Sequence, residues 1–265
     1  MKNQVFIVFD SLRFDVFKKA NTPFIKSLGE WKKAWTQGTY TLPAHMSFFV
    51  GKLPQTTDNT DYYDTVASRF DPENGLHRNT NQLWRLTNPE APREARVTLE
   101  GANIIEGFRQ LGYLTIGSGA VNWFNPELPA ARCLTDPFDH LVFLGHIAAE
   151  AQIAWAAERV QFAVSRNKPY FLFLNLGETH HPFRYKNCPW AKEPSPYGDS
   201  AKCMERQMRC FEYLDVRLKI LFEDLVNYDL IMCSDHGEAL GEDGLWGHGF
   251  CHNTVMEVPL LIVAD

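Results

Sequence analysis

Short runs of apolar residues recur along the chain, and segments with helical periodicity lie between them. Nearly continuous apolar runs of this length are typical of strands that are buried on both faces of a parallel sheet. Five runs fit this description: Val5–Phe9, Tyr113–Ile116, Tyr170–Leu174, Leu230–Cys233 and Leu260–Val263. We therefore expect these five runs to be parallel strands of one sheet.

Three segments between the runs predict helices. Leu99–Leu111 places apolar residues three and four positions apart, and Gly112 follows it as a typical helix stop. His146–Val164 is rich in alanine and favours a helix, and an apolar stripe at helical spacing runs from Met204 to Leu225. Strands that alternate with helices predict an α/β fold in which helices sandwich a mainly parallel sheet.

A polar stretch from Pro54 to Pro92, rich in Asn, Thr, Asp and Pro, interrupts the alternation of strands and helices. A segment of this length and composition predicts an excursion over the surface that contributes to substrate specificity. The sequence contains no internal repeat. We therefore expect a single domain over residues 1–265, with a variable insert at about residues 55–98.

Composition and charge exclude several classes of protein. The 265 residues are 45% hydrophobic and 22% charged, which excludes a disordered chain, a collagen and a coiled coil. A net charge of −6 without a basic run speaks against a nucleic-acid partner. No apolar stretch approaches the ~18 residues of a membrane span. No secretory signal is visible, so we expect a cytoplasmic location; the pattern does not indicate the oligomeric state.

The cysteines give no sign of a zinc-binding or redox motif. Six are present, and none forms a C-x-x-C pair. In a chain of this length without a secretory signal, reduced thiols with a structural role are favoured over a disulfide such as Cys188–Cys203.

Groups that bind metals or phosphate follow three of the predicted strands. Asp10 follows the first strand, Glu178 and His180 follow the third, and Asp235 and His236 follow the fourth. In an α/β sheet the carboxyl ends of parallel strands meet at one edge, so these side chains are expected to converge. Crowded, unpaired charges are costly, and a cation would remove that cost.

Thr41 adds a candidate nucleophile to these groups. Pro43 suits the first turn of a helix, so Thr41 is expected at or just before a helix N-terminus, where the free N–H groups favour an anion. The segment alone favours a simpler reading, in which Thr41 is only an N-cap. A threonine hydroxyl needs a base or a metal to ionise it. Asp10, Asp235 and His236 would hold that metal, with Thr41 as a further ligand.

These residues and their neighbours resemble the alkaline phosphatase superfamily, and in particular its sulfatase-like branch. The resemblance covers roughly residues 3–54, 99–120 and 170–265. The segments that carry it are the first strand with Asp10, Thr41-Leu42-Pro43-Ala44-His45, Gly112-Tyr113-Leu114-Thr115-Ile116-Gly117, Glu178-Thr179-His180-His181-Pro182-Phe183, Ser234-Asp235-His236-Gly237-Glu238 and Val258-Pro259-Leu260-Leu261-Ile262. The resemblance implies an alkaline-phosphatase-like fold.

Departures from the sulfatase pattern point to phosphate esters. Sulfatases carry a cysteine, matured to formylglycine, where this chain has Thr41, an arginine where it has His45 and a lysine near Ala120. Asp235-His236 replaces an Asp-Asn pair, and imidazole suits manganese, zinc or iron better than calcium. Threonine with Asp-His is the pattern of the superfamily's phosphodiesterases, lipoteichoic acid synthases and phosphoethanolamine transferases.

The resemblance therefore implies a metal-dependent hydrolase that acts on small-molecule phosphate esters, either monoesters or diesters. Thr41 would be the nucleophile and would form a phospho-enzyme intermediate. The cofactor would be one or two divalent transition metal ions, with manganese or zinc favoured over iron or calcium.

The resemblance also assigns roles to residues around the nucleophile. His180 and His248 would be catalytic residues, and together with Glu178 they would bind a second metal or the substrate phosphate. His181 is an alternative to His180 in this role. Asn122-Trp123-Phe124 is expected to wall a pocket, and His45 is expected to brace the nucleophile segment.

Three alternative functions remain at this stage. The first is a transferase or mutase of phospho groups. The second is a hydrolase of sulfate or phosphonate esters from the same superfamily, since these substrates also present a tetrahedral anion. The third is a metal-binding pseudoenzyme without turnover.

Overall fold

A seven-stranded sheet forms the centre of the protein. The computed structural model describes residues 1–51, 103–128 and 131–264. The strands lie in the order β2-β9-β6-β1-β5-β3-β4. Their bounds are β1 Asn3–Phe9, β2 Lys32–Trp35, β3 Leu114–Gly119, β4 His140–Phe143, β5 Tyr170–Leu176, β6 Tyr228–Ser234 and β9 Glu257–Val263. The five strands from β6 to β4 are parallel, and β9 and β2 extend the sheet in antiparallel fashion.

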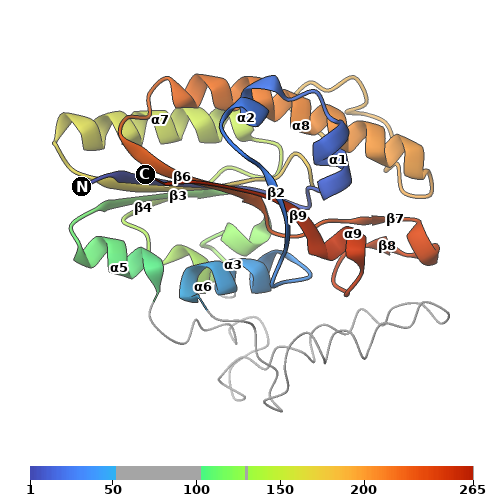
Figure 1. Ribbon diagram of the computed structural model, residues 1–265, viewed down its shortest axis with the longest axis horizontal. Helices are drawn as coiled ribbons and strands as arrows, with labels where there is room; N and C mark the ends of the chain where they lie inside the picture. The colour runs from blue at the N-terminus through green and yellow to red at the C-terminus, as the bar shows by residue number, and fades with distance from the viewer. Residues whose placement is uncertain (52–102, 129–130, 265) are drawn as a thin grey trace, which may run out of the picture.

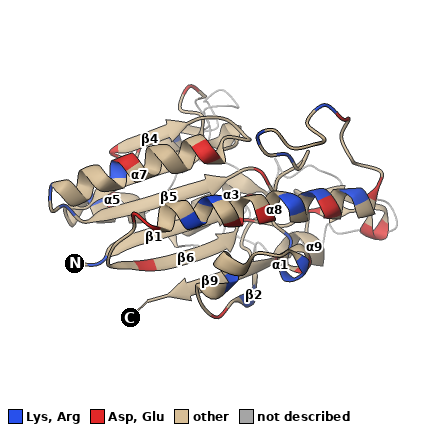
Figure 2. Ribbon diagram, turned by 90° about the horizontal axis from the view of Figure 1, so that it is seen from above, with Lys and Arg blue, Asp and Glu red and all other residues tan. Residues whose placement is uncertain are grey.

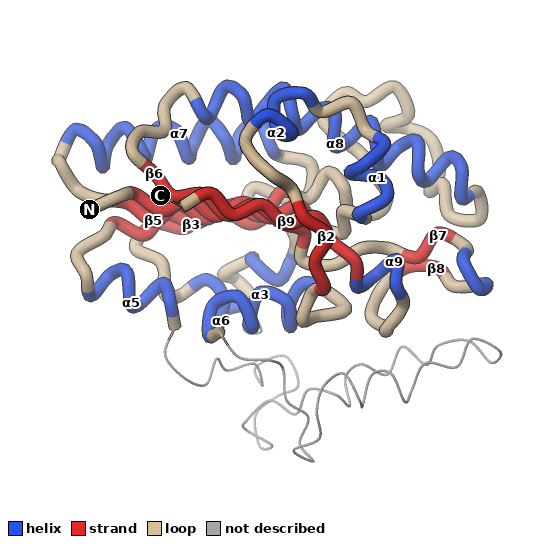
Figure 3. Tube along the Cα trace, viewed as in Figure 1, coloured by secondary structure: helices blue, strands red, loops and turns tan. Residues whose placement is uncertain are grey.

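Helices cover both faces of the sheet (Figure 1, Figure 3). One face carries α1 (Phe14–Lys19), α2 (Pro23–Ser27), α7 (Ala149–Ser165) and α8 (Ser200–Phe222). The other face carries α3 (Thr41–Val50), α5 (Ile104–Gln110) and α6 (Arg132–Thr135). Charged residues occur along α7 and α8, whereas β1 and β5 are almost free of them (Figure 2). This arrangement confirms the predicted α/β fold with a mainly parallel sheet.

A separate apolar core fills the space on each side of the sheet. The first is aliphatic in large part and packs residues of β1, β5, α7 and α8 together. The second is rich in phenylalanine, and in it Phe173 of β5 packs against Phe49 of α3 at 5.2 Å between ring centroids. Burial of this apolar surface on both faces fixes the sheet, and therefore the positions at which its strands end.

Four of the five predicted strands are parallel strands of the sheet, and the fifth prediction is wrong in direction. Leu260–Val263 belongs to β9, which runs antiparallel to both β6 and β2. β9 begins at the edge of the sheet at which β6 ends, so the chain between them, which includes the short helix α9 (Asn253–Met256), does not have to cross a face of the sheet. An apolar run does not show the direction of its strand, so the sequence pattern could not distinguish a parallel β9 from an antiparallel one.

The two edge strands of the sheet were not predicted. The edge strand β2 has two lysines and is mostly exposed, whereas β4 contains the short apolar run Leu141–Phe143, which is only half-buried.

Some predictions fall on residues that the structure does not describe. The insert at residues 55–98 lies outside the described residues, as does the start of the predicted helix Leu99–Leu111. Its remainder is the helix α5, and the other two predicted helices are α7 and α8.

A small hairpin follows β6 and completes the described fold. It consists of β7 (Ala239–Leu240), the 3-10 turn η5 (Glu242–Gly244) and β8 (Trp246–Gly247). No disulfide joins any of the six cysteines, all of which lie in the described part of the chain. Among the described residues, no helix is both long and apolar enough to cross a membrane.

Candidate active site

Three neighbouring strands bring the candidate ligands together. β1 lies between β5 and β6, all three are parallel, and Phe9 is in register with both Leu176 and Ser234. The residues that follow these three positions therefore share one edge of the sheet. Asp10 comes after β1 and Asp235 after β6, while His180 comes shortly after β5. The predicted convergence of these strand ends is confirmed.

Asp10, Asp235 and His236 form a compact group of ligand atoms. Their side chains are completely buried, and one ligand atom from each lies within 4.8 Å of the others. His236 Nε2 is 3.8 Å from Asp10 Oδ1 and 3.6 Å from Asp235 Oδ2. Neither Asp235 Oδ2 nor His236 Nε2 has a hydrogen-bond partner among the residues that the structure describes. Buried polar atoms without partners are costly unless a ligand satisfies them.

The charges of this group fit a divalent transition metal. Burial and the neighbouring Asp10 raise the pKa of Asp235 well above its usual range. Burial also acts to raise the pKa of Asp10, but the neighbouring histidines, His180 and His236 above all, lower this pKa overall. Burial, aided by His248, lowers the pKa of His236 to about 3, so this imidazole is neutral at neutral pH. Two carboxylates and one neutral imidazole are a donor set that zinc and manganese accept.

Hydrogen bonds around the group orient each candidate ligand. His236 Nδ1 donates to the carbonyl of Gly237 at 2.8 Å, which leaves the lone pair on Nε2, facing the carboxylates. The backbone N–H of Ser11 donates to Asp235 Oδ1 at 3.1 Å. Ser11 reaches this position with a φ of 62°, which is unusual for a residue other than glycine. Such strain, held beside a buried carboxylate pair, is typical of functional sites.

Thr41 lies beside the group at the start of α3. Its hydroxyl Oγ1 donates to Asp10 Oδ2 at 3.4 Å, and its side chain is buried. Thr41 is the first residue of the helix, with Pro43 in the first turn as predicted, and the N-cap residue is Tyr40. The alternative reading of Thr41 as the N-cap is therefore wrong. The hydroxyl instead faces the carboxylate of Asp10.

A pocket of about 440 Å³ opens next to Thr41. One part of its wall is imidazole, and another part is apolar. The lining residues are Thr41, Ala120, Val121, Asn122, Trp123, Phe143, Gly145, His146, His180, His181 and His248. Asn122 and Trp123 wall the pocket as expected, whereas Phe124 is fully buried behind it. A polar end beside an apolar wall suits an ester whose anionic group binds near Thr41.

The two predicted catalytic histidines lie side by side in this pocket. The ring centroid of His180 is 5.2 Å from that of His248, and His248 is 4.4 Å from His236. Both imidazoles therefore lie within reach of a substrate that contacts Thr41. His45 points elsewhere: its Nδ1 donates to the carbonyl of Thr41 at 2.7 Å, as expected of a residue that braces this segment. Burial lowers the pKa of His45 to about 4.

Glu178 lies away from the other candidate ligands. Its Oε1 accepts a hydrogen bond at 2.8 Å from the backbone N–H of Ala149, the first residue of α7. Among the described residues, two groups of His, Cys, Asp and Glu side chains have a geometry that suits a metal, and Glu178 belongs to neither of them. Burial raises the pKa of Glu178 to about 7. The structure therefore places this carboxyl at a helix N-terminus and does not bring it to the histidines.

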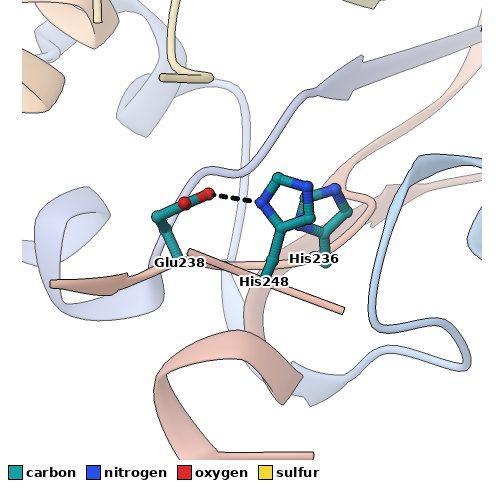
Figure 4. Close-up of side chains that lie close together, drawn as sticks. All are labelled: His236, Glu238 and His248. Atoms are coloured by element: carbon teal, nitrogen blue, oxygen red, sulfur yellow. Dashed lines mark hydrogen bonds and ion pairs between the residues drawn. The ribbon is translucent and has the colours of Figure 1, made fainter. Parts of the chain in front are cut away.

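Two residues of the site were not singled out from the sequence. His146 lines the pocket with its ring centroid 4.9 Å from that of His180, and it follows β4 in a part of the chain without a recognised motif. Glu238 accepts a hydrogen bond from His248, Nδ1 to Oε2, at 2.7 Å (Figure 4). Its position in the run Ser234–Glu238 was a usable signal, since that run contains two of the candidate metal ligands.

Comparisons with known proteins find a matching family model and solved structures with a similar fold. A family model described as Sulfatase matches residues 2–265. The structure is similar to the C-terminal periplasmic domain of phosphoethanolamine transferase EptC from Campylobacter jejuni, with a TM-score of 0.64 and 15% identity over 99% of this chain and 79% of that one. No curated protein matches the sequence.

Two further solved structures have a similar fold. The lipoteichoic acid synthase LtaP from Listeria monocytogenes has a TM-score of 0.62 and 11% identity over 99% of this chain and 65% of that one. The C-terminal periplasmic domain of EcEptC from Escherichia coli, in complex with Zn, has a TM-score of 0.60 and 13% identity over 99% of this chain and 73% of that one. At these identities the likeness concerns the fold alone.

Proposed function

This chain belongs to the sulfatase family, and from that premise we propose that it is a metal-dependent hydrolase of phosphate esters with Thr41 as its nucleophile. One observation carries the proposal. The hydroxyl of Thr41 lies 3.4 Å from Asp10, at the N-terminus of α3 and at the edge of a pocket lined by histidines. A nucleophile, an anion-binding helix end and candidate metal ligands thus meet at one point.

The residue at position 41 favours phosphate over sulfate as the reacting group. The usual sulfatase nucleophile is made from a cysteine, and a threonine cannot be converted to it. At the two positions where sulfatases carry a lysine and an arginine, this chain has Ala120, which is small, and His45, which is buried and does not line the pocket. A phosphate ester attacked by an ionised hydroxyl needs neither of these missing groups.

Asp10, Asp235 and His236 are the residues that would hold the cation, with Thr41 next to them. A divalent cation supplies Lewis acidity when bound: it lowers the pKa of an alcohol and polarises a phosphoryl oxygen. The orphaned atoms Asp235 Oδ2 and His236 Nε2 fit this assignment, and a nitrogen ligand favours zinc or manganese. The zinc complex of the E. coli neighbour supports the same choice.

The residues of this chain then account for each step. Thr41 loses its proton to solvent, and its Oγ1 attacks phosphorus to form a phosphothreonine while the leaving alcohol departs. His180 and His248 donate hydrogen bonds to the phosphoryl oxygens or to the leaving oxygen. Water then attacks phosphorus, the bond from phosphorus to Thr41 breaks, and Thr41 regains a proton. The apolar wall around Trp123 holds the organic part of the ester.

Hydrolysis assays on a set of matched variants test the proposal. We would measure turnover of p-nitrophenyl phosphate, bis-p-nitrophenyl phosphate and p-nitrophenyl sulfate with added Mn²⁺, Zn²⁺ or Ca²⁺. Thr41→Ala should reduce kcat for the best phosphate ester by at least about 1,000-fold. Thr41→Ser keeps the hydroxyl and should retain activity. Ser47→Ala removes another buried hydroxyl of α3, outside the pocket, and should behave as wild type.

The same assays separate the alternatives. Near-wild-type turnover by Thr41→Ala would overturn the assignment of the nucleophile. Turnover of the sulfate ester in preference to both phosphate esters would indicate a sulfatase. Metal binding without turnover of any ester would indicate a pseudoenzyme. Release of p-nitrophenol that rises with an added acceptor alcohol, with the phosphoryl group recovered on that alcohol, would indicate a transferase.

A further inference from the structure

Glu238 and His248 are held opposite each other by the hairpin between them. In the pair of β7 and β8, Ala239 faces Gly247 and Leu240 faces Trp246. Glu238 and His248 are the next residues beyond this register, one on each strand. The carboxylate of Glu238 accepts the hydrogen bond from His248 Nδ1 at 2.7 Å (Figure 4). The contact is therefore set by the hairpin itself.

Each polar group of Glu238, in the side chain and in the backbone, makes a hydrogen bond that holds the residue in place. Its side chain is completely buried, and its Oε1 accepts a hydrogen bond from the hydroxyl of Tyr197. Its backbone N–H donates to the carbonyl of Thr254 at 3.0 Å, and its carbonyl accepts from Arg13 Nη1 at 3.0 Å. A carboxyl group held in this way has no freedom to turn away from His248.

The contacts of Glu238 fix which nitrogen of His248 faces it. The hydroxyl of Tyr197 bonds to Oε1, and His248 Nδ1 bonds to Oε2. A carboxylate only accepts hydrogen bonds, so both partners donate to it. His248 Nδ1 is therefore the donor, and Nε2 lies on the far side of the ring from Glu238.

The segment of His248 is also tied to the nucleophile. Gly247 and Gly249 flank it with φ values of 91° and 97°, a conformation that glycine adopts without strain. The N–H of Gly249 donates to the carbonyl of Thr39 at 2.7 Å, two residues before Thr41. His248 itself lines the pocket that Thr41 lines. The imidazole is thus held relative to the hydroxyl that attacks.

We propose that Glu238 is a positioning residue, which holds His248 so that Nε2 gives a proton to the leaving oxygen of the ester. This inference rests on the proposed function. In the reactive form of His248 both ring nitrogens carry a proton, with Nδ1–H bonded to Glu238. As the Thr41 Oγ1–phosphorus bond forms, the bond from phosphorus to the leaving oxygen breaks and its electron pair stays on that oxygen. This oxygen takes the proton from Nε2, which leaves His248 neutral with its remaining proton on Nδ1. In the second half of the reaction, the attacking water gives a proton back to Nε2.

A second cation is the main competing explanation. His236, Glu238 and His248 also form a group whose ligand atoms lie within 4.8 Å of one another. The direct hydrogen bond between Glu238 Oε2 and His248 Nδ1 already uses one candidate ligand atom of each residue. His236 Nε2, moreover, faces Asp10 and Asp235. The geometry favours an ion pair over a second metal.

Kinetics of Glu238→Gln test the proposal through the leaving group. Phenyl phosphate has a poorer leaving group than p-nitrophenyl phosphate and needs the proton more. We expect kcat on phenyl phosphate to fall roughly 10- to 100-fold, kcat on p-nitrophenyl phosphate to fall much less, and KM to change little. The loss should be absent in a His248→Ala background, since the two residues act as a unit. Glu205→Gln is the matched control, because it makes the same chemical change at an exposed position of α8 outside the pocket.

A spectroscopic measurement tests the positioning without any turnover. Two-bond ¹H–¹⁵N spectra of the histidine side chains report which ring nitrogen is protonated. At a pH at which His248 is neutral, we expect the Nδ1–H form in the wild type and a loss of this preference in Glu238→Gln. Tyr197→Phe removes one hydrogen bond to Glu238 and should give a smaller change of the same kind, which keeps the test available if Glu238→Gln does not fold.

Specific results would overturn the proposal. These are equal losses of kcat on the two esters, additive losses in the double variant, or an Nδ1–H form that persists in Glu238→Gln. A fall in bound Zn²⁺ from two ions to one per chain in Glu238→Gln would assign the pair to a metal site instead. If the wild type hydrolyses no ester, the proposed function fails, and the ¹H–¹⁵N spectra still decide whether Glu238 holds His248.

Discussion

Asp10 and Asp235 are two carboxylates that share one buried site, and this makes the site costly to build. Neither side chain is exposed to solvent, and the charge of Asp10 contributes to the raised pKa of Asp235. In the metal-free protein this repulsion opposes folding. In the proposed site, the side chains that would bind the cation therefore lower the stability of the chain until the cation binds, which is a common relation between function and stability.

Asp235→Asn should separate these two effects. The variant removes one charge but keeps the oxygen that accepts from Ser11 N, so we expect the metal-free protein to gain about 1–3 kcal/mol in the free energy of unfolding. Zn²⁺ or Mn²⁺ at 100 times its Kd should add about 2.7 kcal/mol to the wild type and almost nothing to the variant. Urea denaturation with and without the metal measures both quantities.

Asp215→Asn is the matched control for this comparison. Asp215 is also buried, but its carboxylate accepts hydrogen bonds from the backbone of Phe24 and Ile25, far along the chain from the site. The control should keep the full gain in stability from the metal. A wild-type gain from the metal in Asp235→Asn would show that the cation binds elsewhere.

At the scale of elements, Glu178 links the end of β5 to the start of α7. Its folded-state pKa of about 7 exceeds its ordinary value of 4.5, so the folded protein binds more protons than the unfolded chain between these values. The contribution of this group to stability is therefore present at low pH and is lost as the pH rises through about 7. This is the behaviour of a buried carboxyl that accepts a hydrogen bond at the start of a helix.

Glu178→Gln should remove this pH dependence. Between about pH 5 and pH 8, the free energy of unfolding of the variant relative to wild type should rise by up to about 3 kcal/mol. Urea denaturation with a chelator present measures the difference. Glu150→Gln, in the first turn of α7, should show no such rise, because the hydrogen bond from Lys186 lowers the pKa of Glu150 instead of raising it. A difference for Glu178→Gln that does not change with pH would contradict the assignment.

The turn after β6 tolerates only glycine at position 237. A Cβ added there would lie 2.0 Å from the carbonyl oxygen of Thr254, which accepts the N–H of Glu238. Gly237→Ala should therefore cost about 2–3 kcal/mol of stability and weaken metal binding through His236. Gly107→Ala, in α5 with open space around it, should instead gain about 0.5–1 kcal/mol. Equal stabilities of the two variants in urea would refute this view of the turn.

The strands of the site could be predicted from the sequence because their signal is local. β1, β5 and β6 are apolar runs, and Asp10, Asp235 and His236 follow them directly. The predicted direction of β9 was wrong because an apolar run does not show which strand it pairs with or in which direction. Glu238 was missed for a related reason: its contact with His248 depends on a hairpin of two-residue strands, which is too short to give a pattern.

At the scale of the whole molecule, the site is a product of sheet topology. Asp10 and Asp235 are 225 residues apart in sequence and become neighbours only because β1 pairs with β6. Thr41 reaches them from a helix on one face of the sheet, while α7 and α8 pack on the other (Figure 1). The two apolar cores hold these layers together, and so they support the geometry on which the proposed chemistry depends.

Anomalous scattering from a crystal grown with Mn²⁺ or Zn²⁺ tests the central claim most directly. We expect an anomalous peak with Asp10, Asp235 and His236 as ligands, at about 2.0–2.2 Å from each coordinating atom. Thr41 Oγ1 should lie next to the same ion. A fully occupied peak elsewhere in the molecule, with Asp235 Oδ2 and His236 Nε2 making no contact to an ion, would contradict the account.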